Sequence, residues 1–338
     1  EVGLDQPWEG GGARFVTRDG ALVAWTTAGQ DPSTPFRIVG AHTDSPNLRL
    51  KPNPDSGTAG WRQLGVEVYG GALWNSWLDR DLGLSGRVVV RGLDGFRTEL
   101  LLVDRPLARI PQLAIHLDRD VNGQGLKLNP QVHLTPVWGL GPWAEGDLAG
   151  FLARELSVDV ADVVAWDLMF HDITPPTRLG RDQELVASAR LDNLLSCWAG
   201  PVALGSVART RSILPSTPVL CLFDHEEVGS TSATGADGAL LAQVLERVVL
   251  ARGGDRQDLL RALSGSVCAS VDMAHATHPN HPERHDPAHH VRVNAGPVVK
   301  INANQRYATS GTSHAVLVRA CEVAGVPQPA AGPVVWKM

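Results

Sequence analysis

The 338-residue sequence has few cysteines, and none is spaced for a paired role. The four cysteines are Cys197, Cys221, Cys268 and Cys321. They are spaced singly, so no C-x-x-C motif predicts a zinc ribbon or a redox centre. So low a density also argues against a disulfide framework and favours a reducing compartment. The opening residues EVGLDQPWEG show no signal-peptide pattern. We therefore expect a cytoplasmic protein.

The chain also lacks a basic excess and any long apolar run. Lys and Arg total 30 against 36 Asp and Glu, which gives a net charge of −6 and argues against a nucleic-acid partner. No apolar run approaches the roughly 18 residues needed to cross a bilayer, so no membrane partner is expected. The length instead suggests two globular domains, or one domain with an insertion.

Hydrophobic patterning divides the chain into three stretches. Residues 1–60 contain short apolar runs joined by Gly-rich turns, and residues 61–181 contain many strand-like runs with frequent turns. Residues 182–338 alternate between helix-like and strand-like runs, which is typical of an α/β layer with a mostly parallel sheet. We predict an α/β domain formed by 1–60 and 182–338, interrupted by a β-rich insertion at 61–181.

Individual elements follow from the same patterns. Apolar runs bounded by turn residues predict strands at 21–29, 36–42, 66–70, 86–92, 96–104, 126–134, 217–227 and 264–275. Apolar residues at helical spacing predict helices at 143–157, 191–206, 238–252 and 313–325.

Acidic and histidine residues follow three of the predicted strands. FRIVG leads into His42 and Asp44, VLCLF into Glu226 and Glu227, and SGSVCASV into Asp272. Ligands bind at the carboxyl ends of strands in open α/β sheets. Paired carboxylates after an apolar strand are costly unless a cation compensates their charge. Because His nitrogen and carboxylate oxygen are zinc ligands, these segments predict a metal site.

Each of these residues also has a less specific interpretation, as a polar turn, a solvated surface pair or, for Asp192 at the start of a predicted helix, an N-cap.

A two-metal hydrolytic site needs ligands on each ion and a base for the attacking water. Asp44 can fix the tautomer of His42. Neighbouring Glu226 and Glu227 would point in opposite directions on an extended segment, so that one could bind metal while the other faces the water.

Six segments, in this order, resemble the aspartyl aminopeptidase family, the M18 metallopeptidases. They are VGAHTDSPNLRLKPNP (39–54), LAIHLDR (113–119), ARLDNLLS (189–196), LFDHEEVGSTSATGADG (222–238), SVDMAHATHPNHPERH (270–285) and GPVVKINANQRYATSG (296–311). They span most of the chain, and EEVGS and INANQRYA are specific. The resemblance implies an α/β zinc-peptidase domain, interrupted by a β-rich dimerisation domain.

The resemblance also implies a function, namely a dinuclear metal-dependent aminopeptidase that removes N-terminal Asp or Glu from peptides. Glu226 would act as the general base that activates the attacking water together with the metals, and Asp44 would orient His42. The metal ligands would be His42, Asp192 as the bridging carboxylate, Glu227 and Asp272. The two divalent ions are expected to be Zn, and Mn or Co would suit the same ligands.

Three further residues match the family's substrate contacts. Lys300 is expected to provide the positive charge that binds an acidic side chain, and Tyr307 is expected to donate a hydrogen bond to the substrate. Family members form a homo-oligomer, a dodecamer built from dimers. In that assembly His116 is expected to reach the active site of a neighbouring subunit.

The sequence departs from the family pattern at both ends. The pattern includes an N-terminal helix and a final His ligand in a segment close to Met-His-Ser, and neither occurs in these 338 residues. His314 opens a helix-like stretch and does not match. We expect either a fragment or a truncated protein. Two hypotheses stay open: the active aminopeptidase, and a catalytically impaired or inactive family member that serves as an assembly subunit.

Overall fold

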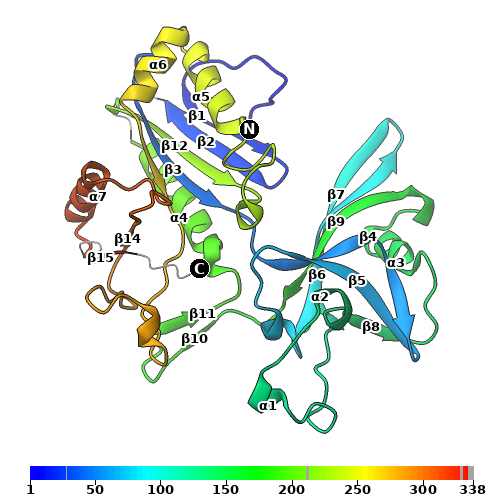
Figure 1. The fold of residues 1–338 in the computed structure, drawn as a ribbon. Coiled ribbons are helices and arrows are strands. Elements are labelled where there is room, and N and C mark those ends of the chain that lie inside the picture. The colour runs from blue at the N-terminus through cyan, green and yellow to red at the C-terminus, as the bar shows by residue number, and fades with distance from the viewer. Residues whose placement is uncertain (28, 211–212, 328–329, 334–338) are drawn as a thin grey trace.

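The computed structural model describes residues 1–27, 29–210, 213–327 and 330–333. The last residues of the expected catalytic segment, 334–338, lie outside the described residues. Figure 1 shows two lobes, one built on a twisted sheet with helices on its faces and the other on a β-barrel. The chain is therefore a mixed α/β protein. Among the helices in the described ranges, none is long and apolar enough to cross a membrane.

The sheet of the first lobe has five strands in the order β1-β2-β12-β3-β13. Their bounds are Gly12–Arg18 (β1), Ala21–Thr27 (β2), Thr217–Phe223 (β12), Phe36–His42 (β3) and Val267–Ser270 (β13). β3 runs parallel to β12 and β13, whereas β2 is antiparallel to β1 and β12.

The prediction of a mostly parallel sheet is therefore wrong, because the sheet is mixed. Only Asp19 and Gly20 connect β1 to β2, and a two-residue turn forces the chain to reverse. The strand that carries Lys300, β14 (Val298–Ile301), pairs instead with β15 (Ala330–Pro333) outside this sheet.

Helices cover both faces of the mixed sheet (Figure 1). They are α4 (Leu191–Ala208), α5 (Leu240–Ala251) and α6 (Arg256–Ser264), and α7 (Gly311–Ala324) lies beside β14. Successive β12 side chains point to opposite faces. Val219 and Cys221 pack in the cluster that includes α5, while Leu220 and Leu222 pack on the side of α4. This alternation shows that β12 is a central strand buried on both faces. Its carboxyl end lies at the same end of the sheet as the carboxyl end of the parallel strand β3.

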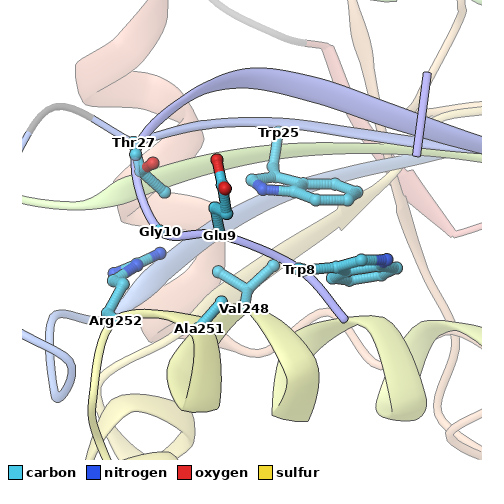
Figure 2. A pocket seen from close by; sticks show the side chains of 9 residues that line it. Trp8, Glu9, Gly10, Trp25, Thr27, Val248, Ala251 and Arg252 are labelled. Atoms are coloured by element: carbon cyan, nitrogen blue, oxygen red, sulfur yellow. The ribbon is translucent and has the colours of Figure 1, made fainter. Parts of the chain in front are cut away.

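The N-terminal segment closes one face of the sheet against α5 (Figure 2). The Trp8 ring stacks on Trp25 with ring centroids 5.0 Å apart, and the Arg247 guanidinium lies 3.9 Å from the Trp8 ring centroid. The pocket that Trp8 and Trp25 line with Val248 and Arg252 has a volume of about 10 Å³. That volume holds one water molecule at most, so this pocket is not a substrate site.

The second lobe is a closed barrel with the strand order β4-β5-β8-β7-β6-β9 and antiparallel pairing throughout. The strands are β4 (Asn47–Thr58), β5 (Trp61–Tyr69), β6 (Asp81–Gly92), β7 (Gly95–Arg109), β8 (Val137–Leu140) and β9 (Val163–Asp172). Because β4 pairs with β5 and β9, residues 47–60 belong to the barrel and not to the stretch before the predicted boundary at 61.

Two predicted elements in the barrel lobe have different outcomes. The helix expected at 143–157 is α3 (Asp147–Leu156), whose Leu148 and Leu152 are buried in the barrel core. The prediction of a strand at 126–134 is wrong, because this stretch contains the short helix α2 (Pro130–His133). Asn129 accepts a hydrogen bond from the backbone N–H of Gln131, and a proline in the first turn favours helix initiation.

The remaining elements are short. They are η1 (Trp74–Trp77), α1 (Val121–Gln124), η2 (Val160–Asp162), η3 (Glu226–Val228), η4 (Pro282–Arg284) and the hairpin of β10 (Thr177–Leu179) and β11 (Leu185–Ala187).

Candidate metal centre

His42 ends the central strand β3 and is the buried member of the site, with 4 % of its surface exposed. Its Nδ1 atom lies 3.0 Å from the backbone oxygen of Asp44. A carbonyl oxygen can only accept, so Nδ1 carries a proton, and Nε2 is the nitrogen that can act as a metal ligand once it is deprotonated. Nε2 lies 3.2 Å from Oδ1 of Asp192 and 3.6 Å from Oδ1 of Asp272. The ring is therefore oriented to offer a ligand nitrogen to a cation.

Parallel pairing brings the carboxylates to the same place as His42. Phe223 of β12 pairs with His42, and Ser270 of β13 pairs with Gly40. The residues that follow these strands therefore meet at the carboxyl ends of the parallel strands. Ligands usually bind at this position in open α/β sheets.

Asp192 comes from the start of α4, where its backbone is non-helical and the Asp192–Asn193 peptide is cis. The Ser45 hydroxyl donates to the backbone oxygen of Asp192 over 2.9 Å. The fully buried Asn193 donates from Nδ2 to the backbone oxygen of Val271 over 2.8 Å. These two hydrogen bonds fix the start of α4 beside the segment that carries Asp272.

Two groups of described residues have ligand atoms within 4.8 Å of one another. The first consists of His42, Asp192 and Asp272, and the second of His42, Glu226 and Glu227. One imidazole and four carboxylates form a donor set that fits zinc and other divalent ions. His42 belongs to both groups, so the two groups adjoin.

The two glutamates do not point in opposite directions, which corrects the sequence-based reasoning. They lie in the 3₁₀ turn η3, not in an extended segment, and His225 before them has a φ of 63°. Both carboxylates therefore approach His42, and the Oε2 atom of Glu226 lies 4.0 Å from Nε2.

Asp44 connects the pieces of the site, and 7 % of its side chain is exposed. The Tyr69 hydroxyl donates to its Oδ2 atom over 2.8 Å. The backbone N–H groups of Glu226 and Glu227 donate to its Oδ1 and Oδ2 atoms, each over 3.1 Å. Its Oδ1 atom also lies 3.4 Å from Nδ1 of His42. One carboxylate thus positions the imidazole, the glutamate turn and the end of β5.

The pKa shifts show an excess of negative charge around His42. Burial alone would lower the pKa of His42, but hydrogen bonds to Asp272 and Asp44 outweigh it and raise the pKa to about 11. Burial and the neighbouring Glu226 carboxylate raise the pKa of Glu227 to about 7. Burial and Asp272 also raise the pKa of Asp192. Such crowding favours a bound cation or bound protons.

The three expected substrate residues lie in different surroundings. Lys300 lies beside the site, with Nζ 2.7 Å from Oδ2 of Asp272 and 5.6 Å from the ring centroid of Tyr307. Tyr307 is half-buried. His116 is exposed in the loop between β7 and α1, and neither group of candidate metal ligands among the described residues includes it.

Sequence reasoning missed Tyr69, Asn193 and Ser45 as residues that position the site. Asn193 had a local signal, because it directly follows Asp192 and is polar at the start of an apolar helix. Tyr69 had no such signal, because its partner Asp44 lies 25 positions away and joins it only through the folded barrel.

Comparison with known proteins decides the family. A family model described as "Aminopeptidase I zinc metalloprotease (M18)" matches residues 2–331. The chain belongs to the M18 family. This M18 chain is 58 % identical over 330 residues to "Probable M18 family aminopeptidase 2" of Streptomyces coelicolor, covering 97 % of this chain and 76 % of the relative. The Mycobacterium leprae protein of the same name is 52 % identical over 319 residues, covering 93 % and 73 %.

Solved structures of related proteins share the fold of the M18 chain. The cryo-EM structure of the Ape4 and Nbr1 complex matches with a TM-score of 0.92 at 35 % identity, covering 99 % of this chain and 68 % of that one. The structure of the S. cerevisiae mApe1 dodecamer matches with a TM-score of 0.82 at 25 % identity, covering 97 % and 75 %. The M18 chain is thus a metallo-aminopeptidase, a hydrolase of peptide bonds. None of these relatives favours the alternative of an inactive subunit.

Proposed function

We propose that this M18 chain removes acidic N-terminal residues from peptides at a site that holds two divalent metal ions. The observation that carries the proposal is the convergence of one imidazole and four carboxylates at the end of β3. His42, Asp192, Glu227 and Asp272 would hold the ions, and Asp192 is the proposed shared ligand. Zinc is the proposed metal, in line with the family description, and Mn or Co suits the same donors.

Divalent ions held there would polarise the scissile carbonyl and lower the pKa of a water molecule. Glu226 accepts the proton of the attacking water and then returns it to the leaving amine. Its side chain is half exposed, so water and substrate can reach it. Asp44 keeps the backbone of Glu226 in place through the N–H hydrogen bond and keeps His42 in the required tautomer.

Lys300 is the proposed recognition residue for the acidic side chain of the substrate. Its side chain is 20 % exposed, so its ammonium is partly desolvated beside Asp272. A fixed cation distinguishes an acidic side chain from a neutral one, whereas a hydrophobic wall cannot. Tyr307, next to Lys300, is the proposed hydrogen-bond donor to the substrate.

The proposed assembly is a dodecamer built from dimers, and the related yeast protein mApe1 forms a dodecamer. Dimerisation through the barrel lobe is supported by exposed apolar side chains on β7, among them Leu100 at 79 % and Leu102 at 69 % exposure. An unpaired subunit would leave this apolar surface in water. His116 is exposed, as its proposed contact with the active site of a neighbouring subunit requires.

The two neighbouring glutamates test the proposed roles. Glu226→Gln keeps the shape but removes the proton acceptor, so kcat should fall by roughly 10²–10⁴ with metal still bound. Glu227→Gln should instead lower the bound metal content. Kinetics on an aspartyl peptide, together with metal analysis of both purified variants, show which glutamate is the proton acceptor and which is the metal ligand. If Glu226→Gln loses metal and Glu227→Gln keeps it, the assignment is reversed.

A further inference from the structure

The two glutamates of the site belong to a turn that starts at His225. This residue follows β12 after Asp224 and has a φ of 63°, in the left-handed region that residues other than glycine seldom adopt. The backbone N–H of Ser230 donates to the carbonyl oxygen of His225 over 2.8 Å and closes the turn. The conformation of His225 therefore determines where Glu226 and Glu227 point.

The side chain of His225 connects this turn to the loop that follows it. Its Nδ1 atom lies 2.8 Å from Oγ of Ser232 and 3.3 Å from Oγ1 of Thr234. Oγ of Ser232 also accepts the backbone N–H of Gly235 over 3.0 Å, so the hydroxyl proton can be donated to Nδ1. The Ser232 hydroxyl thus joins the imidazole ring to the backbone of the loop.

The glutamate turn is therefore held at two points. The Asp44 carboxylate accepts the backbone N–H groups of Glu226 and Glu227, and it positions the glutamates themselves. Ser232 positions the residue from which the turn starts. A shift of that residue would move both carboxylates relative to His42.

His225 is not itself placed as a metal ligand or as a base. Its Nδ1 atom faces Ser232, and its Nε2 atom lies 3.8 Å from Oδ2 of Asp224. Neither group of candidate metal ligands in the part of the chain that the structure describes includes His225. An effect of this ring on the reaction must therefore pass through the position of the turn.

We propose that His225 is a positioning residue, which holds the glutamate turn in place through the hydrogen bond between its Nδ1 atom and the Ser232 hydroxyl. The inference rests on the proposed function, because it takes Glu226 as the base and Glu227 as a metal ligand. Glu226 must reach the proton of the attacking water, and a displacement of about 1 Å can lower turnover about 100-fold. Glu227 should also bind metal less tightly when the turn shifts.

Three substitutions of His225 separate the hydrogen bond from the backbone conformation. In His225→Asn, Oδ1 stands as far from the backbone as Nδ1 does and can accept the same bond, and asparagine readily adopts a positive φ. In His225→Gln, the amide lies farther out, near the position of Nε2, and misses Ser232. His225→Gly relaxes the backbone and removes the side chain.

The measurement is kcat and KM on an aspartyl peptide at saturating zinc. The Gln and Gly variants should lose about 10–100-fold in kcat while KM changes by less than about threefold, because the base acts in the transition state. The Asn variant should restore kcat to within about threefold of the wild-type value. The inference is overturned if His225→Gly keeps full kcat, or if the Asn and Gln variants lose it equally.

Ser232→Ala removes the partner without changing His225. It should lower kcat about 10–100-fold in the wild-type chain and in His225→Asn, and it should have little further effect in His225→Gln, where the bond is already lost. Ser33→Ala is the matched control, because its hydroxyl donates to Asp31 over 2.6 Å in the loop before β3, at the end of that strand opposite His42. It should leave kcat unchanged. Equal values of kcat in Ser232→Ala and Ser33→Ala would contradict the inference.

Hydrogen exchange separates this inference from the proposed function. The backbone N–H groups of Glu226 and Glu227 should exchange several-fold faster in His225→Gln than in the wild-type chain, and His225→Asn should restore the wild-type rate. If this order is observed but the wild-type chain hydrolyses no acidic peptide, the proposed function is wrong and the role of His225 in the turn stands. If acidic peptides are hydrolysed and the Asn and Gln variants do not differ in exchange or in kcat, the inference about His225 alone is wrong.

Discussion

Replacing Asp44 by Asn tests whether one carboxylate organises the catalytic site. Asp44 accepts hydrogen bonds from the Tyr69 hydroxyl and from the backbone N–H groups of Glu226 and Glu227. An Asn side chain has one acceptor oxygen and one donor group. Whichever way it is oriented, its NH₂ group faces at least one of these donors.

The expected loss of free energy follows from the number of hydrogen bonds that are lost or weakened. The better orientation keeps the oxygen toward Tyr69 and Glu227 and loses the bond from Glu226. A hydrogen bond to a charged acceptor contributes about 1.5–3 kcal/mol, and the two that remain become neutral and about half as strong. The total is about 3–6 kcal/mol, divided between the stability of the fold and the positioning of the site. Because partners of metal ligands typically affect activity 10–100-fold, we expect kcat/KM to fall by that factor, or about 1.4–2.7 kcal/mol.

The assay measures kcat/KM on an aspartyl peptide, metal affinity and the midpoint of urea unfolding. Asp55→Asn is the matched control, because Asp55 accepts backbone N–H groups of Gly146 and Leu148 at the start of α3 in the barrel lobe. It should lower stability and leave kcat/KM unchanged. Equal losses of kcat/KM in the two variants, or full activity of Asp44→Asn, would refute the positioning role of Asp44.

Two other substitutions probe specificity and ligand placement. Lys300→Met should depress kcat/KM on Asp and Glu substrates about tenfold to a hundredfold more than on Ala substrates, since a charge-assisted contact is lost. An equal loss on all substrates would mean that Lys300 acts by holding Asp272, to which it bonds over 2.7 Å. Asn193→Ala removes the bond to Val271 and should weaken metal affinity about 10–100-fold, as measured by competition with a chelator. Unchanged affinity would show that α4 positions Asp192 without this side chain.

Strands and helices with strong local patterns could be predicted from the sequence. The runs at 21–29, 36–42 and 217–227 correspond to β2, β3 and β12, and 191–206 corresponds to α4. Strand direction could not be predicted, because the antiparallel pairing of β2 with β12 joins residues almost 200 positions apart. Local turn chemistry at Asn129 and Pro130 overrode the apolar pattern at 126–134.

The candidate site was predictable where it follows a general rule and not where it depends on contacts between lobes. His42 ends a strand, and Glu226 and Asp272 follow strands, of one sheet whose parallel strands end on the same side. The contact of Tyr69 with Asp44 requires the barrel to be placed against that edge, which no local pattern encodes.

The central claim is that this chain holds two divalent ions at the end of β3. The most direct measurement is a crystal structure of the protein with zinc, recorded at the zinc absorption edge. Two anomalous peaks about 3.5–4 Å apart are expected, with Asp192 between them and His42, Glu227 and Asp272 as the other ligands from this chain. A single peak, or peaks that lie away from these four side chains, would contradict the account.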